Sequence, residues 1–180
     1  MSLSGFSGVI IGIMACLYVA WLHYGLGYHF WQKNVLSIME VRGQELMIGS
    51  MLLLLLSLLF SMALTVYRTK RKQQQIWTKN VREMMLSIAL PLGVGASLIY
   101  LDGYDYFLDS FFQITLLCYG LGLFAASRYT YSELRYMGAA QIALGILGTA
   151  FQSYVLLFWV LGFGLLHILY GVQMYRKYER

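Results

Sequence analysis

Apolar residues run through this chain in five long stretches that contain no Asp, Glu, Lys or Arg, and the charged residues lie only between these stretches and after the last one. The stretches cover residues 1–32, 46–67, 84–101, 110–127 and 137–175. A helix of about 18 or more apolar residues is long enough to cross a hydrocarbon core of about 30 Å. The pattern therefore predicts an all-α protein, a polytopic transmembrane helical bundle.

The last stretch is about twice as long as one crossing requires. At 1.5 Å per residue, a straight helix over its roughly 40 residues would be about 58 Å long, so the chain has to fold back. The polar interruption Gln152-Ser153-Tyr154 marks the turn. We therefore predict a single domain over residues 1–180 with six spans, at about 8–27, 46–67, 84–101, 110–127, 137–151 and 155–175.

Composition agrees with a membrane location. Apolar residues make up 59% of the chain and charged residues 12%, whereas an average soluble domain carries about 25% charged residues. The net charge of +5 comes from basic residues that flank the spans instead of covering one soluble face. We therefore expect membrane lipids as partners and no nucleic acid.

The basic residues also predict the orientation, because cytoplasmic loops are enriched in Lys and Arg. One side of the membrane receives 11 of the 13 basic residues: Arg68, Lys70, Arg71, Lys72, Lys79, Arg82, Arg128, Arg135, Arg176, Lys177 and Arg180. This predicts a multi-pass protein of the inner (cytoplasmic) membrane with both termini in the cytoplasm. A cleaved signal peptide is the alternative for the first stretch, but no Lys or Arg precedes it.

The loops offer few specific signals. The cluster Arg68, Lys70, Arg71 and Lys72 is a candidate contact for anionic lipid headgroups, although orientation alone also demands a basic loop here. Thr130 and Glu133 have the spacing of a capping box, which predicts that the fifth span begins near Tyr131.

Small residues recur at helical spacing inside the spans. In lipid, such faces let helices approach closely, either within one chain or between two copies. They predict packing surfaces and leave a homo-oligomer open. The faces are Gly8 and Gly12; Ala89, Gly93 and Ser97; Cys118, Gly122 and Ala126; and Ala139 and Ala143.

His167 is the ionisable side chain in the middle of the sixth span, and an intramembrane ionisable group is a functional hypothesis by default. Proton coupling or contact with a substrate is one interpretation. The other is structural, with a neutral imidazole bonded across helices to Gln141 or Gln113. Asp109 lies one helical turn before Gln113 and belongs to an acidic, tyrosine-rich rim over residues 100–109. The simplest interpretation of this rim is a set of solvated carboxylates beside an interfacial belt of aromatic residues.

No catalytic or metal motif is present in the sequence. Cys16 and Cys118 both lie inside spans, and the three histidines form no HExxH pair. We find no Walker A, GxSxG or dinucleotide-binding pattern. We therefore expect no cofactor, no metal and no catalytic residue.

Four segments resemble an uncharacterised family of six-span inner-membrane proteins from Bacteroidetes-type bacteria. They are SLSGFSG at residues 2–8, AASRYTYSELRY at 125–136, LFWVLGFGLLHILYG at 157–171 and MYRKY at 174–178. Members of that family often carry a short polar segment before the SLSG start, which leaves a shortened N-terminus or a different start codon as open alternatives. The resemblance implies a membrane location and, from neighbouring winged-helix regulators, a regulatory protein partner. It implies no activity.

Three functions are compatible with these residues. The first is a non-enzymatic inner-membrane protein with a packing, scaffold or regulatory role. The second is a small transporter or channel subunit that uses His167, Gln141 and Gln113. The third is a lipid-modifying enzyme at the rim formed by Asp102, Asp105 and Asp109. Convergence of the three polar residues on a dry helix contact favours the first, and convergence on a hydrated cavity favours the second.

Overall fold

The computed structural model describes residues 5–25, 77–101 and 104–178, together with scattered residues between Gly49 and Tyr67. For residues 104–109 it describes the backbone alone. Every regular element in these parts of the chain is helical, which confirms the all-α prediction. The helices are α1 (Gly5–Gly25), α3 (Lys79–Leu101), α4 (Tyr104–Ala126), α5 (Glu133–Ala150), α6 (Val155–Val160) and α7 (His167–Tyr178), with a 3-10 turn η1 (Gln152–Tyr154) and a π-helix η2 (Leu161–Leu166).

Within these residues, three helical segments are long and apolar enough to cross a membrane: Phe6–Gly25, Lys79–Leu101 and Gln152–Tyr178. The apolar part of α4, Ser110–Ala126, is shorter. Most of the predicted second span lies outside the described residues, although Leu52, Leu56 and Phe60 within it are helical. The number of six spans therefore stays a prediction.

Helices α3, α4 and α5 begin earlier than the corresponding uncharged stretches do. Helix α3 starts at Lys79 instead of residue 84, and the hydroxyl of Thr78 accepts a hydrogen bond from the backbone N–H of Val81 at 3.4 Å. A side-chain oxygen at this position satisfies one of the free N–H groups of the first turn. A helix can continue through charged residues beyond the hydrocarbon core. The position of the first charged residue therefore predicts where the core ends, but it does not predict where the helix ends.

The capping box predicted at Thr130 and Glu133 is wrong. Helix α5 begins at Glu133, its N-cap residue is Ser132, and no side chain caps it. The Glu133 carboxylate instead accepts hydrogen bonds from Lys177 and Tyr178 at the end of α7. The Glu133 carboxylate therefore takes part in a contact between two helices and does not cap its own helix.

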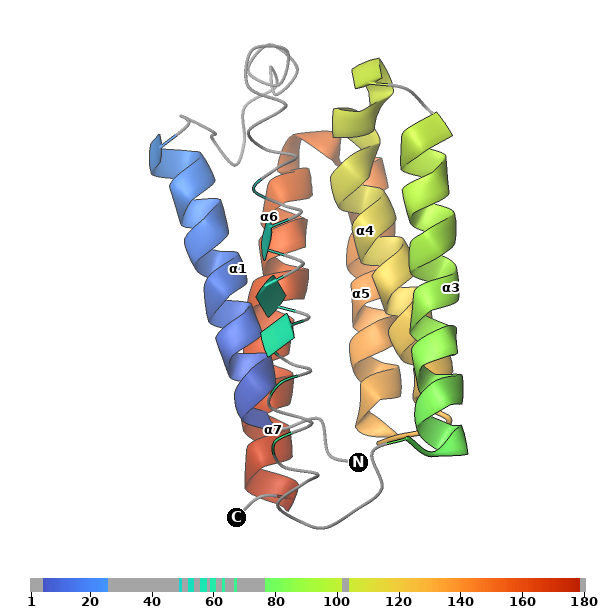
Figure 1. Cartoon of the computed structure of the whole chain (residues 1–180). Helices are drawn as coiled ribbons and strands as arrows, with labels where there is room; N and C mark the ends of the chain where they lie inside the picture. The colour runs from blue at the N-terminus through green and yellow to red at the C-terminus, as the bar shows by residue number, and fades with distance from the viewer. Residues whose placement is uncertain are drawn as a thin grey trace.

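The chain turns back where the polar interruption predicted it. Helix α5 ends at Ala150, and Phe151 leaves the helical region with φ −124° and ψ 66°. The 3-10 turn η1 follows, and Val155 begins the next helix. From there α6, η2 and α7 form one continuous final helix over residues 155–178 (Figure 1).

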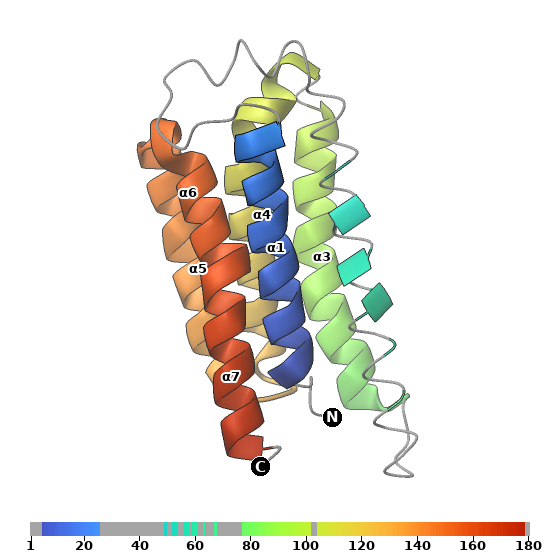
Figure 2. The same ribbon diagram turned by 90° about the vertical axis from the view of Figure 1, so that its left-hand side faces the viewer.

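The helices run side by side along one long axis (Figures 1 and 2). Helix α4 packs against both α3 and α5, while α1 packs against η2 and α7. The beginnings of α1, α3 and α5 and the end of α7 all lie at the lower end of the bundle in Figure 1. This end carries the described basic residues Lys79, Arg82, Arg128, Arg135, Arg176 and Lys177.

Glycines allow the closest helix contacts. A Cβ placed on Gly12 would lie 2.6 Å from the carbonyl oxygen of Gly164, and one placed on Gly8 would lie 3.1 Å from the Cα of Gly171. The predicted face of Gly8 and Gly12 therefore packs against the final helix, as small residues in membrane helices permit. Gly122 likewise meets Ile88 of α3, with its Cβ position 3.1 Å from the Ile88 Cα.

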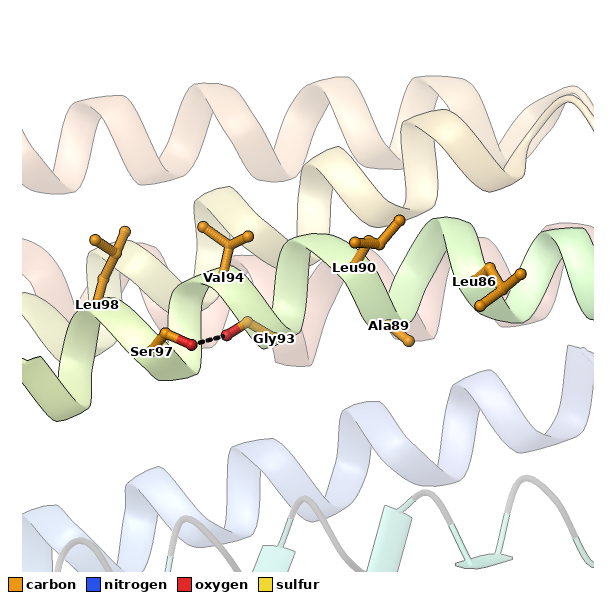
Figure 3. A pocket seen from close by; sticks show the side chains of 7 residues that line it. All are labelled: Leu86, Ala89, Leu90, Gly93, Val94, Ser97 and Leu98. Carbon is orange, nitrogen blue, oxygen red and sulfur yellow. Dashed lines mark hydrogen bonds between the residues drawn. The ribbon is translucent and has the colours of Figure 1, made fainter.

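Two predicted small-residue faces do not pack against the described parts of the chain. Ala139 and Ala143 are exposed, because α5 buries Gly138, Gln141 and Gly145 instead. On α3, Ala89, Gly93 and Ser97 are exposed and lie in an open groove, with Leu90, Val94 and Leu98 standing out on one side of them (Figure 3). A Cβ on Gly93 would meet nothing within 4 Å.

Candidate functional site

Three polar side chains meet where α4, α5 and the final helix pack together. Gln141 comes from the buried face of α5, and His167 is the first residue of α7. Gln141 is 0% exposed and His167 is 4% exposed. Tyr119, a half-buried residue in the second half of α4, completes the group. We call Tyr119, Gln141, Gly162 and His167 the buried polar cluster.

One carbonyl oxygen connects two of these side chains. The amide Nε2 of Gln141 donates to the carbonyl oxygen of Gly162 at 3.0 Å, and Nδ1 of His167 lies 3.0 Å from the same oxygen. A carbonyl oxygen can only accept, so Nδ1 of His167 carries its proton. The neutral imidazole then presents an unprotonated Nε2 on the other side of the ring.

Tyr119 occupies that other side. Its hydroxyl lies 3.0 Å from Nε2 of His167. Because this nitrogen is the acceptor of a neutral imidazole, the Tyr119 hydroxyl donates the hydrogen bond. The two rings are stacked, with centroids 5.5 Å apart and an interplanar angle of 19°. His167 is thereby held from α4 on one side and by its own helix on the other.

The π-helix η2 positions His167 for these bonds. In an α-helix with 3.6 residues per turn, each step of four residues rotates the side chain further around the helix axis. A π-helix has more residues per turn, so it reduces this rotation and keeps side chains four residues apart on one face. Trp159, Phe163 and His167 consequently stack along one face, with successive ring centroids 4.8 Å and 5.7 Å apart. Glycine at position 162 permits the close approach of Gln141, since a Cβ there would lie 2.5 Å from its Oε1 and the Gln141 side chain would have to shift.

Gln113 is buried but does not join the cluster. It is 6% exposed, and in the described parts of the chain no hydrogen bond links it to His167 or Gln141. Its Oε1 and the Oε1 of Gln141 have no hydrogen-bond partner there. The predicted hydrogen bond from His167 to Gln141 or Gln113 is therefore wrong. The two ring nitrogens of His167 are bonded to Tyr119 and to the Gly162 carbonyl instead. The prediction that His167 is bonded across helices is correct.

The remaining candidate residues cannot be placed. The side chain of Asp109 and those of Asp102 and Asp105 lie outside the described residues, as do Arg68, Lys70, Arg71 and Lys72. Over residues 5–25, 77–101 and 110–178, together with the scattered described positions between 49 and 67, no group of three or more His, Cys, Asp or Glu is arranged to hold a metal ion. Cys16 and Cys118 are free thiols.

A second polar contact lies at the end of the bundle that carries the basic residues. Lys177 forms a salt bridge with the Glu133 carboxylate, and the Tyr178 hydroxyl donates to the same carboxylate oxygen at 3.1 Å. These hydrogen bonds, the one from Lys177 above all, lower the pKa of Glu133 from 4.5 to about 2. The contact fastens the first residue of α5 to the last turn of α7.

Sequence reasoning missed Tyr119 and the π-helix. A tyrosine near the middle of an apolar span is itself a signal, because its hydroxyl needs a partner once it is buried. The π-helix leaves no such signal beyond the glycines at 162 and 164.

Comparison with known proteins finds no matching family model, no matching curated protein and no matching solved structure. The site therefore has to be interpreted from its own geometry.

Proposed function

We propose that this chain is a six-span inner-membrane protein with a non-enzymatic packing, scaffold or regulatory role, with both termini in the cytoplasm. The observation that supports the role is the state of His167. The ring is buried and both nitrogens are hydrogen-bonded, one to Tyr119 of the neighbouring helix α4 and the other to the Gly162 carbonyl of its own final helix. A side chain held in this way connects helices, whereas a transport residue has to meet water or substrate.

A groove on the surface of α3 is compatible with the same conclusion. It is lined by Leu86, Ala89, Leu90, Gly93, Val94, Ser97 and Leu98. None of the three predicted polar residues lines it. Its lining is apolar apart from Ser97, whose hydroxyl donates to the Gly93 carbonyl at 2.8 Å. A groove of this kind suits lipid chains or another helix better than a polar solute.

A flux assay tests the packing role. Purified protein in liposomes is compared with empty liposomes for a panel of ions and small solutes, with a pore-forming peptide as positive control. We expect no flux above that of empty liposomes. Flux of any solute that falls in His167→Ala but persists in the matched variant His23→Ala would establish transport instead.

An activity screen tests the absence of enzymatic function. The purified protein is incubated with mixed phospholipids and peptides, and the products are followed by mass spectrometry. We expect no modified product. Turnover that disappears in a variant of the buried polar cluster would show that the protein is an enzyme.

The proposed topology has its own test, which uses exposed positions at opposite ends of α5. Ser132→Cys and Gln152→Cys are made separately in a chain with Cys16→Ala and Cys118→Ala, and intact cells are treated with a membrane-impermeant maleimide. We expect labelling of Gln152→Cys in intact cells and of Ser132→Cys only after permeabilisation. The reverse pattern would mean that the termini lie outside the cytoplasm.

A small transporter or channel subunit is the second candidate, and one observation favours it. Gln113 and Gln141 each bury an Oε1 atom without a partner in the described residues, and Gln141 lies directly against a π-helix. Buried polar atoms without a hydrogen-bond partner occur at functional sites, and so do irregular helices. The flux assay above distinguishes the two candidates.

A further inference from the structure

A continuous series of aromatic rings connects the surface of α1 to the buried polar cluster. Trp21 stacks on Tyr18 with centroids 6.1 Å apart, and Tyr18 meets Trp159 edge-on at 6.0 Å. Trp159 and Phe163 follow at 4.8 Å, and Phe163 and Tyr119 at 5.2 Å. The series ends at the hydrogen bond from Tyr119 to His167.

The two ends of this series differ in what they can reach. Trp21 lies near the end of a membrane-length helix and is 45% exposed, so its ring faces lipid or the lipid–water interface. At the other end, the Tyr119 hydroxyl already donates to an unprotonated imidazole nitrogen at 3.0 Å. Heavy-atom distances of about 2.6–3.2 Å allow direct proton transfer to a base.

This geometry matches what one-electron oxidation of tyrosine requires. A phenol that loses an electron becomes strongly acidic, so oxidation is easiest when a base takes the proton at the same time. Nε2 of His167 is that base, and the Gly162 carbonyl fixes it in the accepting tautomer. After proton transfer, the imidazolium keeps its Nδ1–H bond to the same carbonyl, which stabilises the positive charge.

We propose that Tyr119 and His167 form a redox-active pair that reduces lipid peroxyl radicals arriving at Trp21. One electron passes from Tyr119 across the ring of Phe163 to Trp159, then through Tyr18 to Trp21 and on to the peroxyl radical. The phenolic proton of Tyr119 moves to Nε2 of His167. The peroxide anion takes a proton from interfacial water, which leaves a lipid hydroperoxide, a hydroxide ion, a neutral tyrosyl radical and an imidazolium.

Lipid peroxyl radicals are the fitting oxidant because they form in acyl chains and the exposed ring of Trp21 lies on a helix of membrane-spanning length. The step is stoichiometric and requires no catalytic turnover. It goes beyond the packing role proposed above, and neither the flux assay nor the topology test depends on it.

The experiment uses the full chain in liposomes of polyunsaturated phosphatidylcholine, with a lipid-soluble azo initiator as the source of radicals. Samples are frozen during the reaction and measured by electron paramagnetic resonance. We expect a neutral tyrosyl radical in the wild type and its loss in Tyr119→Phe. Tyr136→Phe is the matched control, because Tyr136 is 77% exposed and outside the ring series, and we expect it to keep the signal.

Two further comparisons test the path and the base. Trp21→Phe should lower the radical yield, whereas Trp77→Phe, an exposed tryptophan outside the series, should not. Pulsed measurements on wild-type protein in D₂O should show an exchangeable deuteron coupled to the radical, from the bond to His167. This measurement needs no variant and so does not depend on folding of a mutant.

The proposal is overturned if the wild type gives no tyrosyl radical, if Tyr119→Phe keeps the signal, or if Tyr136→Phe loses it to the same extent. Equal yields in Trp21→Phe and Trp77→Phe overturn the proposed path. The absence of an exchangeable coupling overturns the role of His167 as the base.

Discussion

The amide nitrogen of Gln141 lies 3.0 Å from the carbonyl oxygen of Gly162, and this bond links two helices that a hairpin already places side by side. Gln141 is completely buried, and its Oε1 has no partner among the described residues. The side chain therefore brings one favourable bond and one unsatisfied oxygen into the bundle. Its net contribution to stability should be small, although it is completely buried.

We predict that Gln141→Leu lowers the free energy of unfolding by only about 0.6 kcal/mol, the average for interhelical hydrogen bonds in a membrane protein. Leucine has a similar volume and removes the unsatisfied Oε1, while the Gly162 carbonyl keeps its bond from His167. Titration of the protein from mild detergent into a denaturing detergent measures the change. Gln173→Leu, at an exposed position of α7, is the matched control and should leave stability unchanged. A loss of several kcal/mol in Gln141→Leu would contradict this interpretation.

Tyr119→Phe should be more costly than Gln141→Leu. It removes the donor to Nε2 of His167, and His167 is 4% exposed, so the nitrogen is left without its partner in a buried site. An unpaired buried acceptor costs about 1–3 kcal/mol. The same detergent titration measures it, with Tyr136→Phe as the exposed control. Equal stability of the two variants would show that the hydrogen bond contributes nothing.

Glycine substitutions distinguish the packed from the open helix faces. Gly12→Ala places a methyl group 2.6 Å from the carbonyl oxygen of Gly164, so α1 must move away from the final helix. Overpacking of this kind typically costs about 1–3 kcal/mol. Gly93→Ala is the matched variant on α3, where a Cβ meets nothing within 4 Å. It should be neutral or stabilise the protein by up to about 1 kcal/mol, because alanine restricts the unfolded chain. Thermal unfolding of both variants in the same detergent provides the comparison, and destabilisation by Gly93→Ala would indicate that the groove is occupied.

The sequence predicted the helical class and the turn at residues 152–154 because both follow from uninterrupted apolar runs and one polar break. It also singled out His167 and Gln141, since polar groups are rare in spans. The partners of His167 could not be read in this way. They depend on a π-helix, on a tyrosine in α4, and on a backbone carbonyl, which no side-chain pattern reveals. The outward orientation of Ala139 and Ala143 likewise depends on which face of α5 meets its neighbours.

The contact between Glu133 and α7 predicts a dependence of stability on pH. Hydrogen bonds from Lys177 and Tyr178 lower the pKa of Glu133 from 4.5 to about 2 in the folded protein. A carboxyl whose pKa is lower in the folded state stabilises that state above its unfolded pKa. This stabilisation is complete above a pH of about 5 and is lost progressively as the pH falls towards about 2. Lys177 is largely exposed, so salt should weaken the effect.

Unfolding of the wild type and of Glu133→Gln, measured between a pH of about 6 and about 2, tests this contact. We expect the wild type to lose stability over this range and the variant to lose less, with the two curves converging at the acidic end. Glu83→Gln is the matched control, because Glu83 pairs with Arg82 on the same helix at 3.6 Å and, among the described residues, forms no ion pair with a second helix. Its curve should follow that of the wild type. Parallel curves for the wild type and Glu133→Gln would show that the carboxylate does not fasten α5 to α7.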